Sequence, residues 1–566
     1  MTAHDYDTDV LIAGGGPIGL VTACALAHHG VRFRIVEQRS EPKPHSRANN
    51  LWARPQELLH RIGLRDRLAE QAFAITKVRT LINGQPVDPV AIADVASPYG
   101  PVLYSGQDVI ETTLAAVIEE RGGQVERGRR LMSFTQDGDG VTAILGPADG
   151  EAQPGGAAQT ETVRCRYLVG ADGGDSLVRG MLGLDFEPEK LANCMNRQVD
   201  AKLSWRRGTS FDTLWFFYYP HGFCGVLPVW GGYHRLFFLA DDTGIPDRDP
   251  TLEEMQAIAR DVTEDETLTL SDPIWLTHNR FQHGVAAHYA RDRVFLAGDA
   301  GHRTLPIGGQ GMNAGLHDAV GLAWRLAMAI EGTAGEAVLA SYDAERGGEH
   351  RALDQRQRKG FHNSVYRGRL KDAAIGAAAK LLPSIGTLLQ GSDDLQQLSV
   401  AYPDSPLSVD HLRGLADFLP HAAPHAGDRA PDAAIVTANG ESASLFDELY
   451  DSTAPGTRWS LLCFDGRQKA ALALLEAAAA DIEAWPFLHA RLVLAAAPLS
   501  GKRDCVSDLD GLAHAAYGIG ARPSLVLIRP DGHIAFRGPA DAPDLLVSYC
   551  RAMFVAQPLA RTGQAA

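Results

Sequence analysis

The residues best placed to do chemistry lie in the stretch 294–326. An apolar run there ends in Gly298-Asp299 and is followed by a glycine-rich loop and a helical pattern from Met312. A carboxylate at the end of a strand can accept hydrogen bonds from sugar-like hydroxyls, and glycines let backbone N–H groups approach a flat ring. The positive N-terminal end of the helix would stabilise an anionic group such as a reduced flavin. The loop residues expected to position such a ring are Pro306, Gly308, Gly309 and Gly311.

A second nucleotide-binding pattern lies near the N-terminus. A short apolar strand at 9–12 precedes a GxGxxG loop, a helix is expected over 20–29, and a second strand at 31–36 stops at an acidic residue. This order is typical of dinucleotide-binding units, in which the first glycine makes a tight turn and the second admits a pyrophosphate to the helix N-terminus. The pattern leaves FAD and NAD open. The candidates from this unit are Gly14, Gly16, Pro17, Gly19 and Glu37.

Further candidates lie between these two patterns. Arg47 follows the second strand closely and could bind a phosphate, and Gln107 opens a helical run. Alternating residues between 124 and 168 predict a β-meander, which ends in GADG at 170–173 and includes Asp172. The segment 185–272 is rich in aromatic residues and in expected strands, one pair of which is separated by a Gly231-Gly232 hairpin turn.

Composition limits the class of protein. A chain of 566 residues is long enough for roughly three domains, and 45% hydrophobic and 22% charged residues are typical of a soluble globular protein. The formal net charge of −16 argues against nucleic acid or an anionic membrane as a partner. No secretory signal or apolar membrane span is expected, and the seven cysteines show no metal-like or CxxC spacing. We therefore expect a reduced, cytoplasmic protein without a metal site.

Three motifs together resemble the single-component FAD-dependent aromatic hydroxylases of the para-hydroxybenzoate hydroxylase type. They are GGGPIG at 14–19, GADGGDSLVR at 170–179 and AGDAGHRTLPIGGQGMNAGLHDA at 297–319, and the resemblance covers residues 9–351. From residue 427 onward the chain resembles the thioredoxin-like C-terminal domain of the phenol hydroxylase branch. The lack of a second cysteine near Cys463 argues against thiol–disulfide chemistry there and favours a structural or dimerisation module.

The resemblance implies a mixed fold of class α/β and α+β. A Rossmann-type FAD-binding domain would carry an inserted β-sheet substrate domain, and a thioredoxin-like domain would follow. The expected boundaries are 1–184 for the first part of the FAD-binding domain, with substrate-domain strands near 75–105, then 185–275 for the substrate sheet, 276–359 for the second part, 360–425 for a helical linker and 426–566 for the C-terminal domain.

The resemblance also implies roles for particular residues. FAD would lie extended, with Glu37 on the ribose, Arg47 and Gln107 along the pyrophosphate and ribityl chain, and Asp299 on the ribityl hydroxyls. Gly311, Met312 and Asn313 would lie against the pyrimidine edge of the flavin. The motif around Asp172 is associated in the family with both FAD and NAD(P)H. Tyr218 and His221 are the candidates on the substrate side.

The implied activity is a monooxygenase reaction. NADPH or NADH would reduce FAD, O₂ would add to the reduced flavin at C4a, and the resulting hydroperoxide would hydroxylate a phenolic or polycyclic aromatic compound. Three alternatives stay open: oxygen insertion of the Baeyer–Villiger type by the same flavin species, an NAD-linked dehydrogenase that uses only the N-terminal pattern, and a non-catalytic flavoprotein. A homodimer is compatible with all of them.

Overall fold

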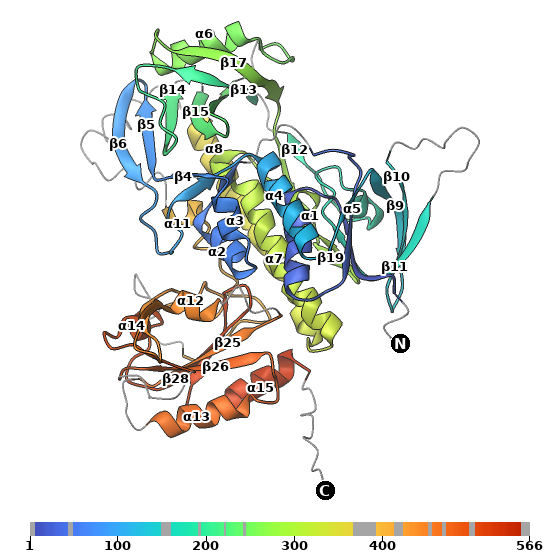
Figure 1. The fold of residues 1–566 in the computed structure, drawn as a ribbon, viewed down its shortest axis with the longest axis vertical. Coiled ribbons are helices and arrows are strands. Elements are labelled where there is room, and N and C mark those ends of the chain that lie inside the picture. The colour runs from blue at the N-terminus through green and yellow to red at the C-terminus, as the bar shows by residue number, and fades with distance from the viewer. Residues whose placement is uncertain are drawn as a thin grey trace.

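The computed structural model arranges the chain in three regions along its long axis (Figure 1). A seven-stranded sheet lies at one end, the C-terminal sheet lies at the other, and an eight-stranded sheet with long helices occupies the middle. Among the described residues, no helix is long and apolar enough to cross a membrane. The structure describes residues 6–42, 49–148, 160–190, 194–219, 222–241, 245–365, 392–412, 423–450, 456–466, 471–496 and 504–555.

The middle sheet has a parallel core in the order β20-β11-β1-β2-β8. Its central residues Val10, Leu11 and Ile12 are fully buried, as expected for a parallel strand covered on both faces. Because β1 and β20 run in the same direction, the two glycine loops that follow them emerge at the same edge of the sheet. The strands are β1 (Thr8–Ala13), β2 (Phe33–Glu37), β8 (Val125–Arg127), β11 (Glu161–Gly170), β20 (Val294–Leu296) and the antiparallel additions β9 (Arg129–Gln136), β10 (Val141–Pro147) and β19 (Ala290–Arg291).

Helices cover this sheet. α1 packs on both α4 and α7, and these helices share one core with Leu20, Leu114 and Leu322, each 0% exposed. The long α7 begins at Gln310, two residues earlier than the sequence pattern indicates. The helices of this region are α1 (Pro17–His28), α2 (Ala53–Arg61), α3 (Arg65–Ala69), α4 (Gln107–Glu120), α5 (Leu177–Met181), α7 (Gln310–Glu331) and α8 (Glu336–Val365). Two short sheets lie beside them. One consists of β3 (Asn50–Leu51), β7 (Val102–Tyr104) and β4 (Phe73–Ile75). The other consists of β12 (Glu189–Lys190), β18 (Gln282–Val285) and β21 (His302–Arg303).

The seven-stranded sheet draws on two separate parts of the chain. The strands β5 and β6 come from the segment before α4, and the other five come from the segment between β12 and β18. The helix α6 (Leu252–Thr263) covers one face and begins with a capping box between Thr251 and Glu254. The predicted hairpin is present, but its loop has three residues instead of the expected two, because Val229 pairs with Tyr233; Gly231 and Gly232 have φ values of 78° and 83°. In spatial order the strands are β17 (Thr269–Asn279), β13 (Cys194–Ser204), β16 (Tyr233–Asp241), β15 (Gly222–Val229), β14 (Thr213–Tyr219), β5 (Lys77–Ile82) and β6 (Gln85–Ala91).

The C-terminal sheet has a thioredoxin-like centre in the order β29-β28-β25-β26. β25 and β26 are parallel and joined through α13, whereas β28 and β29 form the predicted hairpin. The described elements are α11 (Ser392–Leu395), β22 (Val409–Asp410), β23 (Ala434–Val436), β24 (Ser442–Ser444), α12 (Leu445–Leu449), β25 (Trp459–Phe464), α13 (Leu472–Asp481), β26 (Leu488–Leu494), β27 (Cys505–Ser507), α14 (Leu512–Ala516), β28 (Ser524–Ile528), β29 (Ile534–Pro539) and α15 (Asp544–Met553). Most of the expected linker 360–425 lies outside the described residues.

The C-terminal region shares its core with α7. Trp324 and Met328 of α7 pack into the cluster that contains Trp459, and all three side chains are fully buried. A buried ion-pair network crosses the same boundary, because Arg529 donates to both carboxylate oxygens of Glu345 at 2.6 and 2.9 Å. The C-terminal region is therefore joined to the middle of the molecule by a buried, charge-paired interface.

Candidate cofactor and substrate site

The β1–α1 loop has the shape of a phosphate cradle. Gly14 has φ +111°, and a Cβ at this position would overlap the carbonyl oxygen of Ala171. A Cβ on Gly19 would likewise overlap the Gly14 carbonyl. By contrast, a Cβ on Gly16 would meet nothing within 4 Å, and Gly16 is the N-cap of α1 without a side-chain cap. An open space in front of an uncapped helix start fits a pyrophosphate, while Pro17 opens the helix without needing an N–H partner.

Glu37 ends β2 next to this loop and is 4% exposed. One carboxylate oxygen accepts from the backbone N–H of Gly15 at 2.7 Å, and the other accepts from the backbone and Nε of Arg39, both at 2.9 Å. Burial alone would raise the pKa of Glu37, but these hydrogen bonds hold the pKa below its usual value. A carboxylate offers about four acceptor positions, so an ionised Glu37 keeps capacity for a ribose hydroxyl.

The β20–α7 loop forms a second uncapped helix start at the same edge of the sheet. Gly308 and Gly309 have φ of 68° and 61°, and Gly309 is the N-cap of α7 without a side-chain cap. Pro306 precedes these residues as the N-cap of a short 3₁₀ turn. The backbone N–H groups at the start of α7, including those of Gly311 and Met312, are therefore available to an anionic group.

The side chain of Asn313 supports this loop through hydrogen bonds. It is fully buried, accepts from the Trp52 backbone N–H at 3.0 Å, and donates to the carbonyls of Asn50 and Gly309 at 2.9 and 2.8 Å. The indole of Trp52 adds a hydrogen bond to the Gly308 carbonyl at 2.7 Å. The side-chain amide of Asn313 is thus used within the protein. Any contact of Asn313 with a flavin would come from the backbone of this residue.

The remaining predicted cofactor residues lie around the same edge. Asp299 is exposed in the 3₁₀ turn η1 (Gly298–Ala300) that follows β20. Asp172 lies next to the start of α5, where it accepts from Oγ of the N-cap Ser176 at 2.5 Å and from the Val178 N–H at 3.1 Å. Gln107 begins α4 and donates to buried Glu111 at 2.7 Å. Arg47 lies outside the described residues.

A buried charged cluster fixes the third motif to α8. Asp318 accepts from the Gly298 N–H at 2.9 Å and lies 3.2 Å from His302 Nε2 and 2.9 Å from His350 Nε2. These three side chains could hold a metal ion by their spacing, since their ligand atoms lie within 4.8 Å of one another. However, the guanidinium of Arg346 already donates to Asp318 at 2.6 Å and lies 3.1 Å from His350 Nε2, so a metal ion at this point would lie beside a buried positive charge. The cluster is therefore a neutralised support for the loop.

The face of the seven-stranded sheet opposite α6 carries aromatic residues. Phe223 packs against Phe216, Tyr218 and Phe237, with ring centroids 4.8 to 5.6 Å apart. Phe223 and Phe237 also pack against the buried residues Leu239 and Leu305, and Leu305 lies in the β20–α7 loop directly before Pro306. This aromatic face is therefore turned toward the β20–α7 loop and includes Tyr218. His221 lies outside the described residues.

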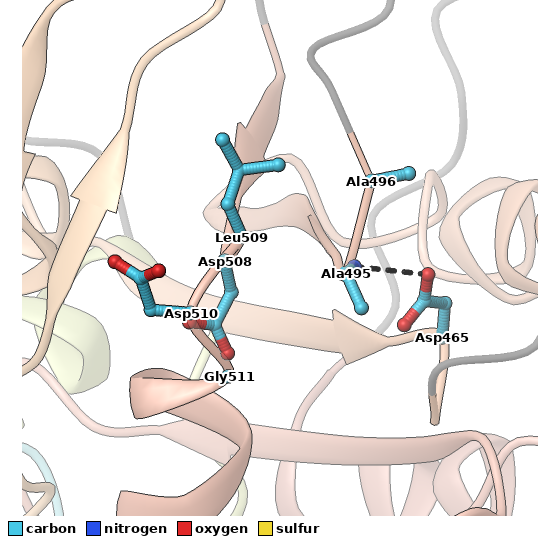
Figure 2. A pocket seen from close by; sticks show the side chains of 7 residues that line it. All are labelled: Asp465, Ala495, Ala496, Asp508, Leu509, Asp510 and Gly511. Carbon is cyan, nitrogen blue, oxygen red and sulfur yellow. Dashed lines mark hydrogen bonds between the residues drawn. The ribbon is translucent and has the colours of Figure 1, made fainter.

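A cavity of about 210 Å³ lies in the C-terminal region (Figure 2), and no residue of either glycine loop lines it. Asp465, Asp508 and Asp510 line it, and the buried His514 contacts Asp508 at 2.7 Å and Asp465 at 3.0 Å. Burial alone would lower the pKa of His514, but these two hydrogen bonds raise it. The turn after β25 contains no cysteine, and burial raises the pKa of Cys463 to about 12. Among the described residues of this region, Cys463, Cys505 and Cys550 are all buried, and none of them is in a disulfide.

The family model described as FAD binding domain matches residues 7–356. The protein belongs to this family. The resemblance to FAD-dependent aromatic hydroxylases, the FAD-binding assignment and the Rossmann-type fold are thereby confirmed.

Relatives extend the similarity over almost the whole chain. The chain is 36% identical to rifampicin monooxygenase of Streptomyces venezuelae over 342 residues, which is 60% of this chain and 68% of that protein. It is 29% identical to 12-dehydrotetracycline 5-monooxygenase/anhydrotetracycline 6-monooxygenase of Streptomyces rimosus over 565 residues, 96% of this chain and 98% of that one. A solved ternary complex of aklavinone-11 hydroxylase with FAD and aklavinone is 26% identical, with a TM-score of 0.70 over 97% of this chain and 99% of that one.

Proposed function

We propose that the protein is an FAD-dependent, NAD(P)H-using monooxygenase that hydroxylates a phenolic or polycyclic aromatic compound. One observation carries the proposal: two uncapped helix starts, at Gly16 and Gly309, open at one edge of the middle sheet beneath an aromatic face. The first fits a pyrophosphate and the second fits the flavin ring. Relatives named as monooxygenases of aromatic compounds support the same function.

FAD, when bound, supplies the hydride acceptor and the means of activating O₂. The chain supplies binding and orientation. Glu37 and the backbone at Gly16 would hold the adenosine and pyrophosphate end, and Asp299 would accept hydrogen bonds from the ribityl hydroxyls. The N–H groups at the start of α7 would stabilise negative charge on the pyrimidine side of the ring.

The aromatic face would hold a flat substrate over the ring and keep water away. Phe216, Phe223 and Phe237 form a contiguous apolar surface, and Leu305 closes it toward the loop. Exclusion of water from such a site favours oxygen transfer over wasteful release of peroxide. Tyr218 and His221 are proposed as its polar neighbours.

We further propose the domain division expected from the sequence, with residues 185–275 and the strands near 75–105 as the substrate domain. The net charge of −16 favours a small-molecule substrate over nucleic acid or an anionic membrane surface. A cytoplasmic location and a homodimer belong to the same proposal.

The test is oxygen labelling. FAD-loaded enzyme is incubated with NADPH or NADH, isotopically labelled O₂ and a panel of phenols and polycyclic phenols. We expect the best substrate both to accelerate NAD(P)H oxidation and to gain one labelled oxygen atom on a ring carbon. A labelled lactone would indicate oxygen insertion beside a ketone instead. Label found only in water or H₂O₂ across the whole panel would contradict the monooxygenase assignment.

A further inference from the structure

Three amide side chains with unpartnered polar atoms lie together on the seven-stranded sheet. Asn196 and Gln198 on β13 are each 4% exposed, and Asn279 on β17 is half-buried. Asn196 Nδ2 donates to Asn279 Oδ1 at 3.1 Å. The atoms Asn196 Oδ1, Asn279 Nδ2 and Gln198 Nε2 are buried without any hydrogen-bond partner among the described residues. We call these three residues the amide row.

The register of the sheet places the amide row on the face that is turned toward the β20–α7 loop. Residues directly opposite each other on neighbouring antiparallel strands share a face. Asn196 is opposite Leu239, and Gln198 is opposite Phe237. Leu239 and Phe237 both belong to the cluster that contains Leu305, the residue before Pro306. The amide row therefore continues the aromatic face on the side of β17.

Buried amide groups without a hydrogen-bond partner lower the stability of the folded protein. A buried donor or acceptor without a partner loses its hydrogen bonds to water and gains none in return, so the large majority of buried polar side-chain atoms in folded proteins are paired. Three orphaned atoms in one row call for a common physical reason. A ligand that supplies the missing partners is such a reason, because the row borders the aromatic face.

The pattern of the orphaned atoms specifies the chemistry of that ligand. Gln198 Nε2 and Asn279 Nδ2 are donors and require oxygen acceptors, whereas Asn196 Oδ1 requires a hydroxyl or N–H donor. Turning over both amides of the Asn196–Asn279 pair exchanges their roles and still leaves one donor and one acceptor. A carbonyl next to a hydroxyl on a fused aromatic ring offers the matching acceptor and donor on one edge.

We propose that the amide row binds the oxygen-bearing edge of a polycyclic aromatic substrate that carries a carbonyl beside a phenolic hydroxyl. This proposal rests on the proposed hydroxylase function and names its substrate class. Phe223 and Phe237 hold the flat rings, and the amide row sets their direction in the plane. The amide row thereby determines which edge of the substrate rings faces the β20–α7 loop.

The test measures binding at equilibrium, which needs no turnover. FAD-loaded enzyme is titrated with a monohydroxyanthraquinone whose hydroxyl lies beside a carbonyl, and with the matching hydroxyanthracene that lacks both carbonyls. Flavin absorbance or fluorescence reports the Kd. Wild-type enzyme should prefer the anthraquinone. Gln198→Met, which keeps the side-chain length and removes the donor, should weaken anthraquinone binding about 3- to 10-fold and leave the hydroxyanthracene unchanged.

A matched control separates recognition from structure. Gln256 on α6 lies on the opposite face of the same sheet, and its amide is fully used by the Leu268 carbonyl and the Leu270 N–H at 2.8 and 2.7 Å. Gln256→Met should lower the thermal midpoint and leave the preference between the two compounds intact. Gln198→Met should show the reverse, with an unchanged or higher midpoint, because it removes an orphaned buried group.

Each outcome decides the proposal. A wild-type enzyme that binds both compounds equally, or neither, overturns it, as does a Gln198→Met enzyme with lower thermal stability and an unchanged preference. Asn196→Leu provides a second variant with the same expected loss of preference. If the enzyme prefers the hydroxyanthraquinone but no product gains labelled oxygen across the panel, the amide row is supported as a binding site and the proposed hydroxylase function is contradicted.

Discussion

Glu37 supports the fold of the β1–α1 loop and is proposed to bind the cofactor as well. Its hydrogen bonds from Gly15 and Arg39 hold the loop in place and keep the group ionised. Because the pKa is lowered in the folded protein, the stabilisation is present above the usual glutamate range and is lost as the pH falls through the lowered pKa. Retention of FAD should weaken in the same acidic range.

Substitution of Glu37 tests this role directly. Glu37→Gln should weaken FAD binding about 10- to 100-fold, since a hydrogen bond to a charged group contributes ~1.5–3 kcal/mol. The measurement is a fluorescence titration of apoprotein with FAD. Glu161→Gln is the control, because Glu161 pairs with Arg34 and Arg129 near the opposite end of the sheet. Equal FAD affinity in both variants would remove Glu37 from the site.

At the scale of elements, the β20–α7 loop depends on a glycine conformation. Gly309 has φ +61°, and an added Cβ would overlap Asn50 Oδ1. The amide of Asn313 holds the same loop through the Gly309 carbonyl. A side chain at position 309 therefore displaces the loop from its support, and its effect does not require contact with the flavin.

Gly309→Ala should cost about 1–3 kcal/mol of stability, since the left-handed conformation and the overlap are both unfavourable for alanine. Loss of FAD and a lower thermal midpoint should appear together. Gly348→Ala is the matched control, because Gly348 is exposed within α8 and a Cβ there meets nothing within 4 Å. That control should raise stability by up to about 1 kcal/mol. A Gly309→Ala enzyme with unchanged stability would show that the loop adapts.

At the scale of the whole molecule, the C-terminal region is expected to stabilise the FAD-binding region without taking part in redox chemistry. Arg325 and Arg529 both pair with Glu345, and Arg529 also pairs with Asp531 at 2.5 Å. All four side chains are almost fully buried. A buried charge that loses its partner is costly, so this interface should make the two regions unfold together.

Arg529→Met should destabilise the protein by about 3–5 kcal/mol, as expected when one partner of a buried ion-pair network is removed. Denaturant unfolding followed by both tryptophan fluorescence and FAD release should shift to a lower midpoint on both signals. Arg522→Met, at an exposed pair with Asp541, should change stability by less than about 1 kcal/mol. FAD release that keeps its wild-type midpoint in Arg529→Met would indicate that the regions unfold independently.

The sequence by itself determined the strand–loop–helix units, and the resemblance of its three motifs to a known family implied FAD as the cofactor. The glycines at 14, 16 and 19 and at 308 and 309 act through short-range sterics, so their spacing indicates the turns directly. The hairpin at Gly231-Gly232 follows from the same local rule. Arg47 and His221 stay predictions, because they lie outside the described residues.

Only the tertiary structure decided the contacts between residues far apart in the chain. Arg529 meets Glu345 across 184 positions, and Asn196 meets Asn279 across 83. Nothing in the local pattern distinguishes these residues from ordinary surface polar groups, since their roles depend on burial and on strand register. Register decides which face of a sheet each side chain occupies, and burial converts a polar group into one that must find a partner.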